Sequence, residues 1–222
     1  LNQPLAGSDP PNLQLRRFLQ SKEMLLVLDN FEQLVDGAAL LADLLAHAPR
    51  LKLLVTSRER LNLVEEWLYS VTGFSPTEAA QLFIQTARRV QPNFTPEGQA
   101  EAITDICQRV EGFPLAVELA ASWTRLMPCE QIGARLRQSL DFLSAGPRNM
   151  PARHRSLKAL FDHSWHLLSS TEQQALARLA VFRGGFAPEE ALAVARATWP
   201  ILAGLVDKSL GVGQANGRYD LH

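Results

Sequence analysis

Two continuous apolar runs constrain the fold more than any other feature of the sequence. The first, Met24 to Leu28, ends at Asp29-Asn30, and the second, Leu51 to Val55, ends at Thr56-Ser57-Arg58. Runs of this length without alternation are typical of strands buried on both faces of a parallel sheet. Between them, Leu34 to His47 repeats apolar residues at helical spacing. The three segments therefore predict a βαβ unit, with short loops at the carboxyl ends of the strands.

The rest of the chain predicts a change of architecture at about residue 73. Trp67 to Val71 predicts a third strand, but after Gly73 the pattern becomes helical. Ser75 with Glu78 is a capping-box helix start, and several further helices follow. Beyond residue 148 we expect more helices and then a hairpin at Asn216-Gly217, which is the order of a winged helix. The expected fold class is α/β plus α: a partial parallel α/β sheet (1–73), a helical domain (74–147) and a winged-helix domain (148–222).

The composition excludes several classes of protein. Of 222 residues, 22 are Lys or Arg and 23 are Asp or Glu, so the net charge of −1 gives no overall reason to expect nucleic-acid or anionic-membrane binding. Two cysteines are too few for a disulfide framework or a four-cysteine zinc site. No signal peptide or membrane-length apolar run is visible. A cytoplasmic location is expected, without membrane partners.

Polar residues at the ends of the two apolar runs are the first candidate site. Asp29 follows the carboxyl end of the first expected strand, where α/β sheets bind ligands in a crevice. An equal alternative is that Asp29 only caps the following loop. Ser57 and Arg58 follow the neighbouring strand, and a guanidinium there suits a phosphate. The alternative for Arg58 is an ordinary surface arginine. For Gly112-Phe113-Pro114, the alternative is a break between two helices that binds nothing.

Taken in order along the chain, these motifs resemble those of a known family. Asp29-Asn30, Thr56-Ser57-Arg58, Gly112-Phe113-Pro114-Leu115-Ala116 and the closing Arg218-Tyr219-Asp220-Leu221-His222 are similar to the motifs of the STAND class of P-loop ATPases. The type that they resemble most is the NB-ARC-like module of large bacterial signalling and transcriptional regulators. Each motif is weak alone, and the resemblance rests on four of them in the right order over nearly the whole chain.

The resemblance implies a role for each matching residue. Asp29 would be the Walker B aspartate that holds Mg²⁺ through water, with Asn30 in place of a frequent second acid. Glu32 is then the candidate for positioning the hydrolytic water, and Arg58, next to Ser57, would read the γ-phosphate of ATP. Pro114 would pack beside the adenine. His222 would contact the β-phosphate of ADP in a closed state.

One motif of the family is missing. No glycine in the chain is followed by lysine, so no G-x-x-x-x-G-K-[ST] loop exists. Since that loop supplies the main phosphate cradle, we expect the chain to be a fragment that lacks the Walker A segment and binds ATP weakly by itself. Removal of that first unit should also leave an open sheet edge and exposed apolar surface.

The expected function is therefore an ADP/ATP-dependent switch in a larger signal-transduction or transcription regulator. Its cofactors would be Mg²⁺ and ATP or ADP, and ATP would be hydrolysed slowly only in the intact protein. Its partners would be the missing P-loop segment, downstream sensor domains and, on activation, further copies. The alternatives are a winged-helix DNA-binding protein and an interaction scaffold without nucleotide. A small basic cluster supports DNA binding weakly: Arg148, Arg153, His154, Arg155 and Lys158.

Overall fold

The computed structural model describes residues 9–139, 143 and 157–221 of the chain. It divides into two compact units, each of which is described by itself. The first comprises Leu1–Leu68 together with Leu168–His222, and the second comprises Tyr69–Leu167. The predicted combination of an α/β part with helical parts is confirmed. The predicted domain boundaries at residues 73 and 147 stay predictions.

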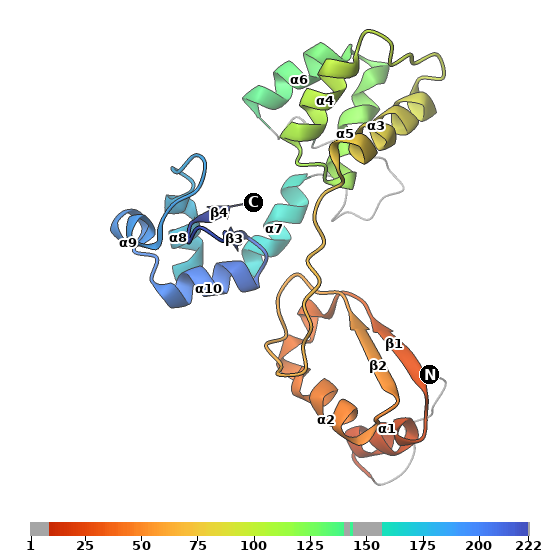
Figure 1. Cartoon of the computed structure of the whole chain (residues 1–222), viewed down its shortest axis with the longest axis vertical. Coiled ribbons are helices and arrows are strands. Elements are labelled where there is room, and N and C mark those ends of the chain that lie inside the picture. Colours follow the sequence, from red (N-terminus) through yellow and green to blue (C-terminus); the bar gives the residue numbers. More distant parts are fainter. Residues whose placement is uncertain (1–8, 140–142, 144–156, 222) are drawn as a thin grey trace. The chain divides into compact units, whose positions relative to one another are not determined.

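The amino-terminal α/β part contains the predicted βαβ unit. Strand β1 (Met24–Leu28) and strand β2 (Leu51–Val55) are parallel, and Met24 pairs with Leu51 at one end and Leu28 with Val55 at the other. Helices α1 (Pro11–Gln20) and α2 (Ala39–His47) pack on one face of this sheet (Figure 1). The predicted central helix is shorter than expected, because two 3₁₀ turns, η1 (Phe31–Gln33) and η2 (Val35–Gly37), precede α2.

The strands are buried on one face only, so the prediction of two buried faces is wrong for this chain. Leu26 and Leu53 point into the cluster formed with α1 and α2. On the other face, Leu25, Val27 and Leu54 are each more than half exposed. Because side chains alternate between the two faces of a strand, these residues form one apolar face. Nothing in the described part of the chain covers that face.

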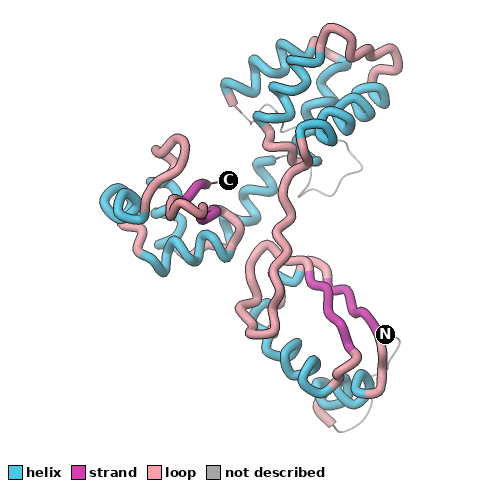
Figure 2. The backbone as a smooth tube through the Cα atoms, viewed as in Figure 1, coloured by secondary structure: helices cyan, strands magenta, loops and turns pink. Residues whose placement is uncertain are grey.

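The predicted third strand at Trp67 to Val71 is also wrong. Figure 2 shows loop throughout the segment between β2 and the next helix, α3 (Pro76–Val90). The alternate residues Trp67, Tyr69 and Val71 are 84% exposed or more. The segment has the composition of a strand, but no neighbouring strand pairs with it among the described residues, and an extended chain becomes a strand only through ladder hydrogen bonds.

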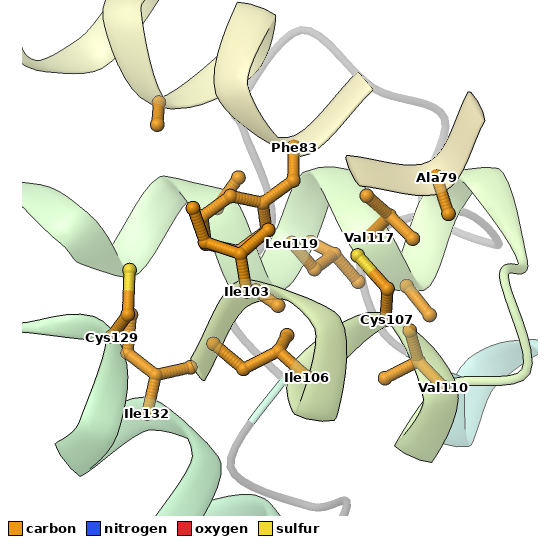
Figure 3. Close-up of a cluster of buried hydrophobic side chains, with 14 of the residues drawn as sticks. Ala79, Phe83, Ile103, Ile106, Cys107, Val110, Val117, Leu119, Cys129 and Ile132 are labelled. Carbon is orange, nitrogen blue, oxygen red and sulfur yellow. The ribbon is translucent and has the colours of Figure 1, made fainter. Parts of the chain in front are cut away.

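The second unit is a helical domain around one core. Helices α3, α4 (Ala100–Arg109), α5 (Pro114–Ser122) and α6 (Cys129–Gln138), with the short turn η3 (Trp123–Arg125), supply its residues. Figure 3 shows Phe83, Ile106 and Val117 from three of these helices in one cluster. Ser75 caps α3, and Glu78 closes the predicted capping box. Helix α7 (Leu157–His166) belongs to this unit too.

The carboxyl-terminal part contains three helices and a hairpin. These are α8 (Ser170–Leu179), α9 (Pro188–Ala195), α10 (Trp199–Asp207) and the antiparallel strands β3 (Gly211–Gly213) and β4 (Tyr219–Leu221). Gly217 has a φ of +78° in the turn, which fits the predicted Asn-Gly hairpin. Glu172 ties two helices together: it closes the capping box with Ser169 at the start of α8 and forms an ion pair with Lys208 after α10.

None of the helices in the described ranges is long and apolar enough to cross a membrane.

Candidate functional site

The carboxyl ends of β1 and β2 bring two of the predicted motifs together. Asp29 follows β1 and Thr56 follows β2, and the Thr56 hydroxyl donates a hydrogen bond to the Asp29 carboxylate. The same hydroxyl oxygen accepts from the backbone N–H of Asn30 at 3.1 Å. Asn30 has a φ of +57°, in the left-handed region that asparagine tolerates better than most residues. The side chains of both strand ends are thus joined through one threonine.

The backbone fixes this edge of the sheet from both sides. The N–H of Thr56 donates to the carbonyl of Leu28 at 2.9 Å, and the N–H of Phe31 donates to the carbonyl of Thr56 at 2.9 Å. The Phe31 ring is buried in a small cluster with Ala38 and Leu41. Parallel strands with tied ends hold their following residues at a constant separation. The backbone at the exposed Asp29 is therefore held in place by the ends of both strands.

Arg58 and Glu32, which the sequence placed in separate roles, form an ion pair in the structure. The Arg58 Nε lies 3.7 Å from the Glu32 Oε1, and the Glu32 side chain is only 4% exposed. Ser57, between Thr56 and Arg58, is half-buried, and its hydroxyl accepts a hydrogen bond from the Glu59 N–H at 3.3 Å. Sequence reasoning missed the pairing because the 3₁₀ turn that carries Glu32 has no strong sequence signal.

The loop after β2 also contacts α10 within the same compact unit. The Arg60 N–H donates to the Asp207 carbonyl at 2.9 Å, and the Arg60 guanidinium lies 3.4 Å from the Asp207 carboxylate. Burial raises the pKa of Glu59, and Glu32 is among the carboxylates that raise it further, whereas Lys208 acts in the opposite direction. The loop that carries Arg58 therefore lies among several carboxylates.

The remaining predicted residues lie elsewhere. Pro114 is the first residue of α5 in the helical unit. Gly112 has a φ of +66°, and its carbonyl accepts from the Phe74 N–H at 2.9 Å, which gives this glycine a structural role of its own. The helix-break alternative for the motif is thus supported for Gly112, while the adenine role of Pro114 stays a prediction. His222 lies outside the described residues, as do the basic residues 148 and 153–155.

The site offers oxygen ligands suited to a hard cation. Asp29 supplies one exposed carboxylate, and Thr56 and Ser57 supply hydroxyls near the same edge. In the described part of the chain, no group of three or more His, Cys, Asp or Glu side chains is placed to hold a metal ion. One carboxylate fits Mg²⁺, which keeps several waters and takes further oxygens from phosphates. The residues therefore fit a nucleotide-borne Mg²⁺ better than an ion bound by protein alone.

Comparison with known proteins shows long relatives of related sequence. No protein-family model matches the chain. A protein of Mycobacterium tuberculosis provisionally named an HTH-type transcriptional regulator is 42% identical over 220 residues, which are 93% of this chain and 25% of the relative. A counterpart in Mycobacterium bovis matches equally. An uncharacterized M. tuberculosis protein is 38% identical over 179 residues, covering 79% of this chain and 46% of its own length.

A solved structure is also similar to the chain, at a low level of identity. It is a Signal Transduction ATPase with Numerous Domains (STAND) protein with a tetratricopeptide repeat sensor, from Pyrococcus horikoshii. The sequence identity is 18% and the TM-score 0.38, over 98% of this chain and 29% of that one. The chain spans about a quarter of the length of the mycobacterial regulators that it matches.

Proposed function

We propose that this chain is part of an ADP/ATP-dependent switch module in a larger transcription regulator. The observation that carries the proposal is the hydrogen bond between Thr56 and Asp29 at the carboxyl ends of β1 and β2, with Arg58 two residues after Thr56. An acidic residue, a hydroxyl and a guanidinium at this end of the sheet suit a magnesium-bound triphosphate. The names of the long mycobacterial relatives support the regulatory part of the proposal.

In this proposal each residue acts on a different part of the nucleotide. Asp29 would hold a magnesium ion, which would supply positive charge to the phosphates when bound. Thr56 keeps the Asp29 carboxylate in place through its hydrogen bond. Arg58 reads the γ-phosphate, which only ATP has. The phosphate cradle itself would come from a Walker A segment, a motif that these 222 residues do not contain.

In this proposal the helical and carboxyl-terminal parts each contribute one residue toward the nucleotide. Pro114 packs beside the adenine, and His222 contacts the β-phosphate of ADP as a hydrogen-bond donor. We interpret α8, α9 and α10 followed by the β3–β4 hairpin as the winged-helix domain that carries this histidine. Exchange of ADP for ATP releases the histidine contact and admits Arg58 to the γ-phosphate. The nucleotide biases two arrangements by its different affinity for each.

The test uses the complete gene product rather than these residues alone. Fluorescent ADP and ATP analogues are titrated into the wild type, Asp29→Ala and Arg58→Ala. We expect Asp29→Ala to weaken magnesium-dependent binding of both nucleotides, and Arg58→Ala to weaken ATP selectively. Arg50→Ala is the matched control, because Arg50 directly precedes the amino end of β2, at the opposite end of the strand from Arg58. Equal ATP affinity in Arg58→Ala and Arg50→Ala would refute the proposal.

The DNA-binding alternative finds little support in the described residues. Helix α10, the candidate reading helix, has the sequence Trp-Pro-Ile-Leu-Ala-Gly-Leu-Val-Asp and thus contains no lysine or arginine. Its Leu202 and Leu205 are buried. Phosphate contacts from basic side chains supply most of the affinity of a DNA-binding helix. We therefore do not propose that this helix reads DNA.

A further inference from the structure

The Glu32 carboxylate is buried, so a hydrolytic water would have little access to it. Its side chain is 4% exposed, and its Oε1 lies 3.7 Å from the Arg58 guanidinium, whose side chain is 29% exposed. The preceding residue, Phe31, is anchored twice: its ring is buried, and its N–H donates to the Thr56 carbonyl. The short 3₁₀ turn that carries Glu32 is therefore tied to Thr56 at the end of β2. The carboxylate faces an arginine that we place at the nucleotide.

We propose that Glu32 is a positioning residue for Arg58, not the residue that positions water. Its carboxylate competes with the γ-phosphate for the same guanidinium and thereby sets how strongly ATP is preferred over ADP. The pairing stands on the geometry alone, whereas the effect on nucleotide preference rests on the proposed function of Arg58.

Two physical effects act in the same direction. While the pair is intact, the guanidinium is oriented toward the buried carboxylate, and a phosphate must draw it away or share it. The fixed negative charge of Glu32 also repels a phosphate that approaches Arg58. Replacement by glutamine removes the charge while the shape of the side chain stays nearly the same. Glu32→Gln should therefore release Arg58 and favour the triphosphate.

The first experiment tests the pairing without any nucleotide. The 222-residue chain is treated with phenylglyoxal, and the modification rate of Arg58 is measured by peptide mass spectrometry relative to that of Arg50. We expect Glu32→Gln to raise this ratio about fivefold, which corresponds to the loss of a modest ion pair. Glu32→Asp, which keeps the charge but withdraws it, should raise the ratio less.

Two controls separate the pairing from general effects. Asp36→Asn removes one negative charge from the neighbouring turn η2 and should leave the ratio unchanged, because the structure pairs Arg58 with Glu32. Arg50 is the internal reference for folding, because partial unfolding of the sheet would raise the modification of both arginines together. An unchanged ratio in Glu32→Gln, or an equal rise in Asp36→Asn, would overturn the pairing.

The second experiment measures the ATP:ADP affinity ratio in the complete gene product. We expect Glu32→Gln to raise the ratio about fivefold, and to have no effect once Arg58→Ala is present. If Arg58→Ala alone leaves the wild-type ratio unchanged, the proposed function fails while the pairing can still hold. If Arg58→Ala lowers the ratio but Glu32→Gln does not raise it, this inference alone is wrong. Lost hydrolysis with an unchanged ratio would instead return Glu32 to the water-positioning role.

Discussion

The ion pair between Glu172 and Lys208 yields a prediction whose size follows from the structure. Lys208 Nζ lies 2.9 and 2.8 Å from the two Glu172 oxygens, and the two side chains are 19% and 12% exposed. Lys208→Met keeps the apolar stem but leaves the Glu172 carboxylate mostly buried without its cation. Loss of one partner costs ~3–5 kcal/mol for a fully buried pair. Because the Ser169 bonds to Glu172 remain, we expect about 2 kcal/mol here.

Amide hydrogen exchange is the suitable assay, because a chain with several compact parts need not unfold in one step. A loss of about 2 kcal/mol corresponds to roughly thirtyfold faster exchange in α8 and α10, since ~1.4 kcal/mol is a factor of ten. The control is Lys52→Met, an exposed lysine in β2. If Lys208→Met accelerates exchange in α8 no more than Lys52→Met does, the pair contributes nothing and the reasoning is refuted.

The pH dependence gives an independent check on the same pair. Burial acts to raise the pKa of Glu172, but the hydrogen bonds from Lys208 and Ser169 outweigh it, so the pKa is lower than that of an ordinary glutamate. A lowered pKa contributes stability above the ordinary value, and this stability is lost as the pH falls through the lowered one. The difference between wild type and Lys208→Met should therefore shrink at acidic pH.

Three further predictions concern the site and the core. Thr56→Val should remove both hydrogen bonds of the hydroxyl and lower the free energy of unfolding by about 1 kcal/mol. In calorimetry of the complete gene product, Thr56→Val should bind magnesium–nucleotide more weakly, whereas Thr56→Ser should retain binding. Phe83→Ala should destabilise the helical unit by ~3–5 kcal/mol, because the Phe83 ring is fully buried. Hydrogen exchange in α3 and α5 measures this loss. The control is Leu25→Ala on the exposed sheet face, which should leave that exchange unchanged. Burial raises the pKa of the Cys107 and Cys129 thiols to about 11. About one thiol in a thousand is then ionised at pH 8, so iodoacetamide should label these cysteines only after unfolding. Rapid labelling of the native chain would contradict this prediction.

The sequence predicted local elements better than their surroundings. Met24 to Leu28 and Leu51 to Val55 were recognised as parallel strands, because an apolar run that ends in polar residues is a local signal. Their exposed face differs from the prediction of two buried faces but agrees with the expectation of exposed apolar surface. The strand expected at Trp67 to Val71 is absent, because strand pairing depends on what lies beside a segment. The meeting of Asp29 with Thr56 follows from parallel topology, whereas the Glu32–Arg58 pair depends on a 3₁₀ turn without a clear periodicity.

Gly112 has a consequence for how its motif is used to recognise other proteins. A Cβ at this position would lie 2.3 Å from the Phe74 carbonyl oxygen, so any side chain would push apart the two segments that meet there. A substitution of this glycine would therefore strain the helical unit, whether or not a nucleotide binds. A related protein with the same helical unit would be expected to retain this glycine, with or without a nucleotide site. In genome searches, the glycine of the motif therefore points to the helical domain and carries no information about a nucleotide.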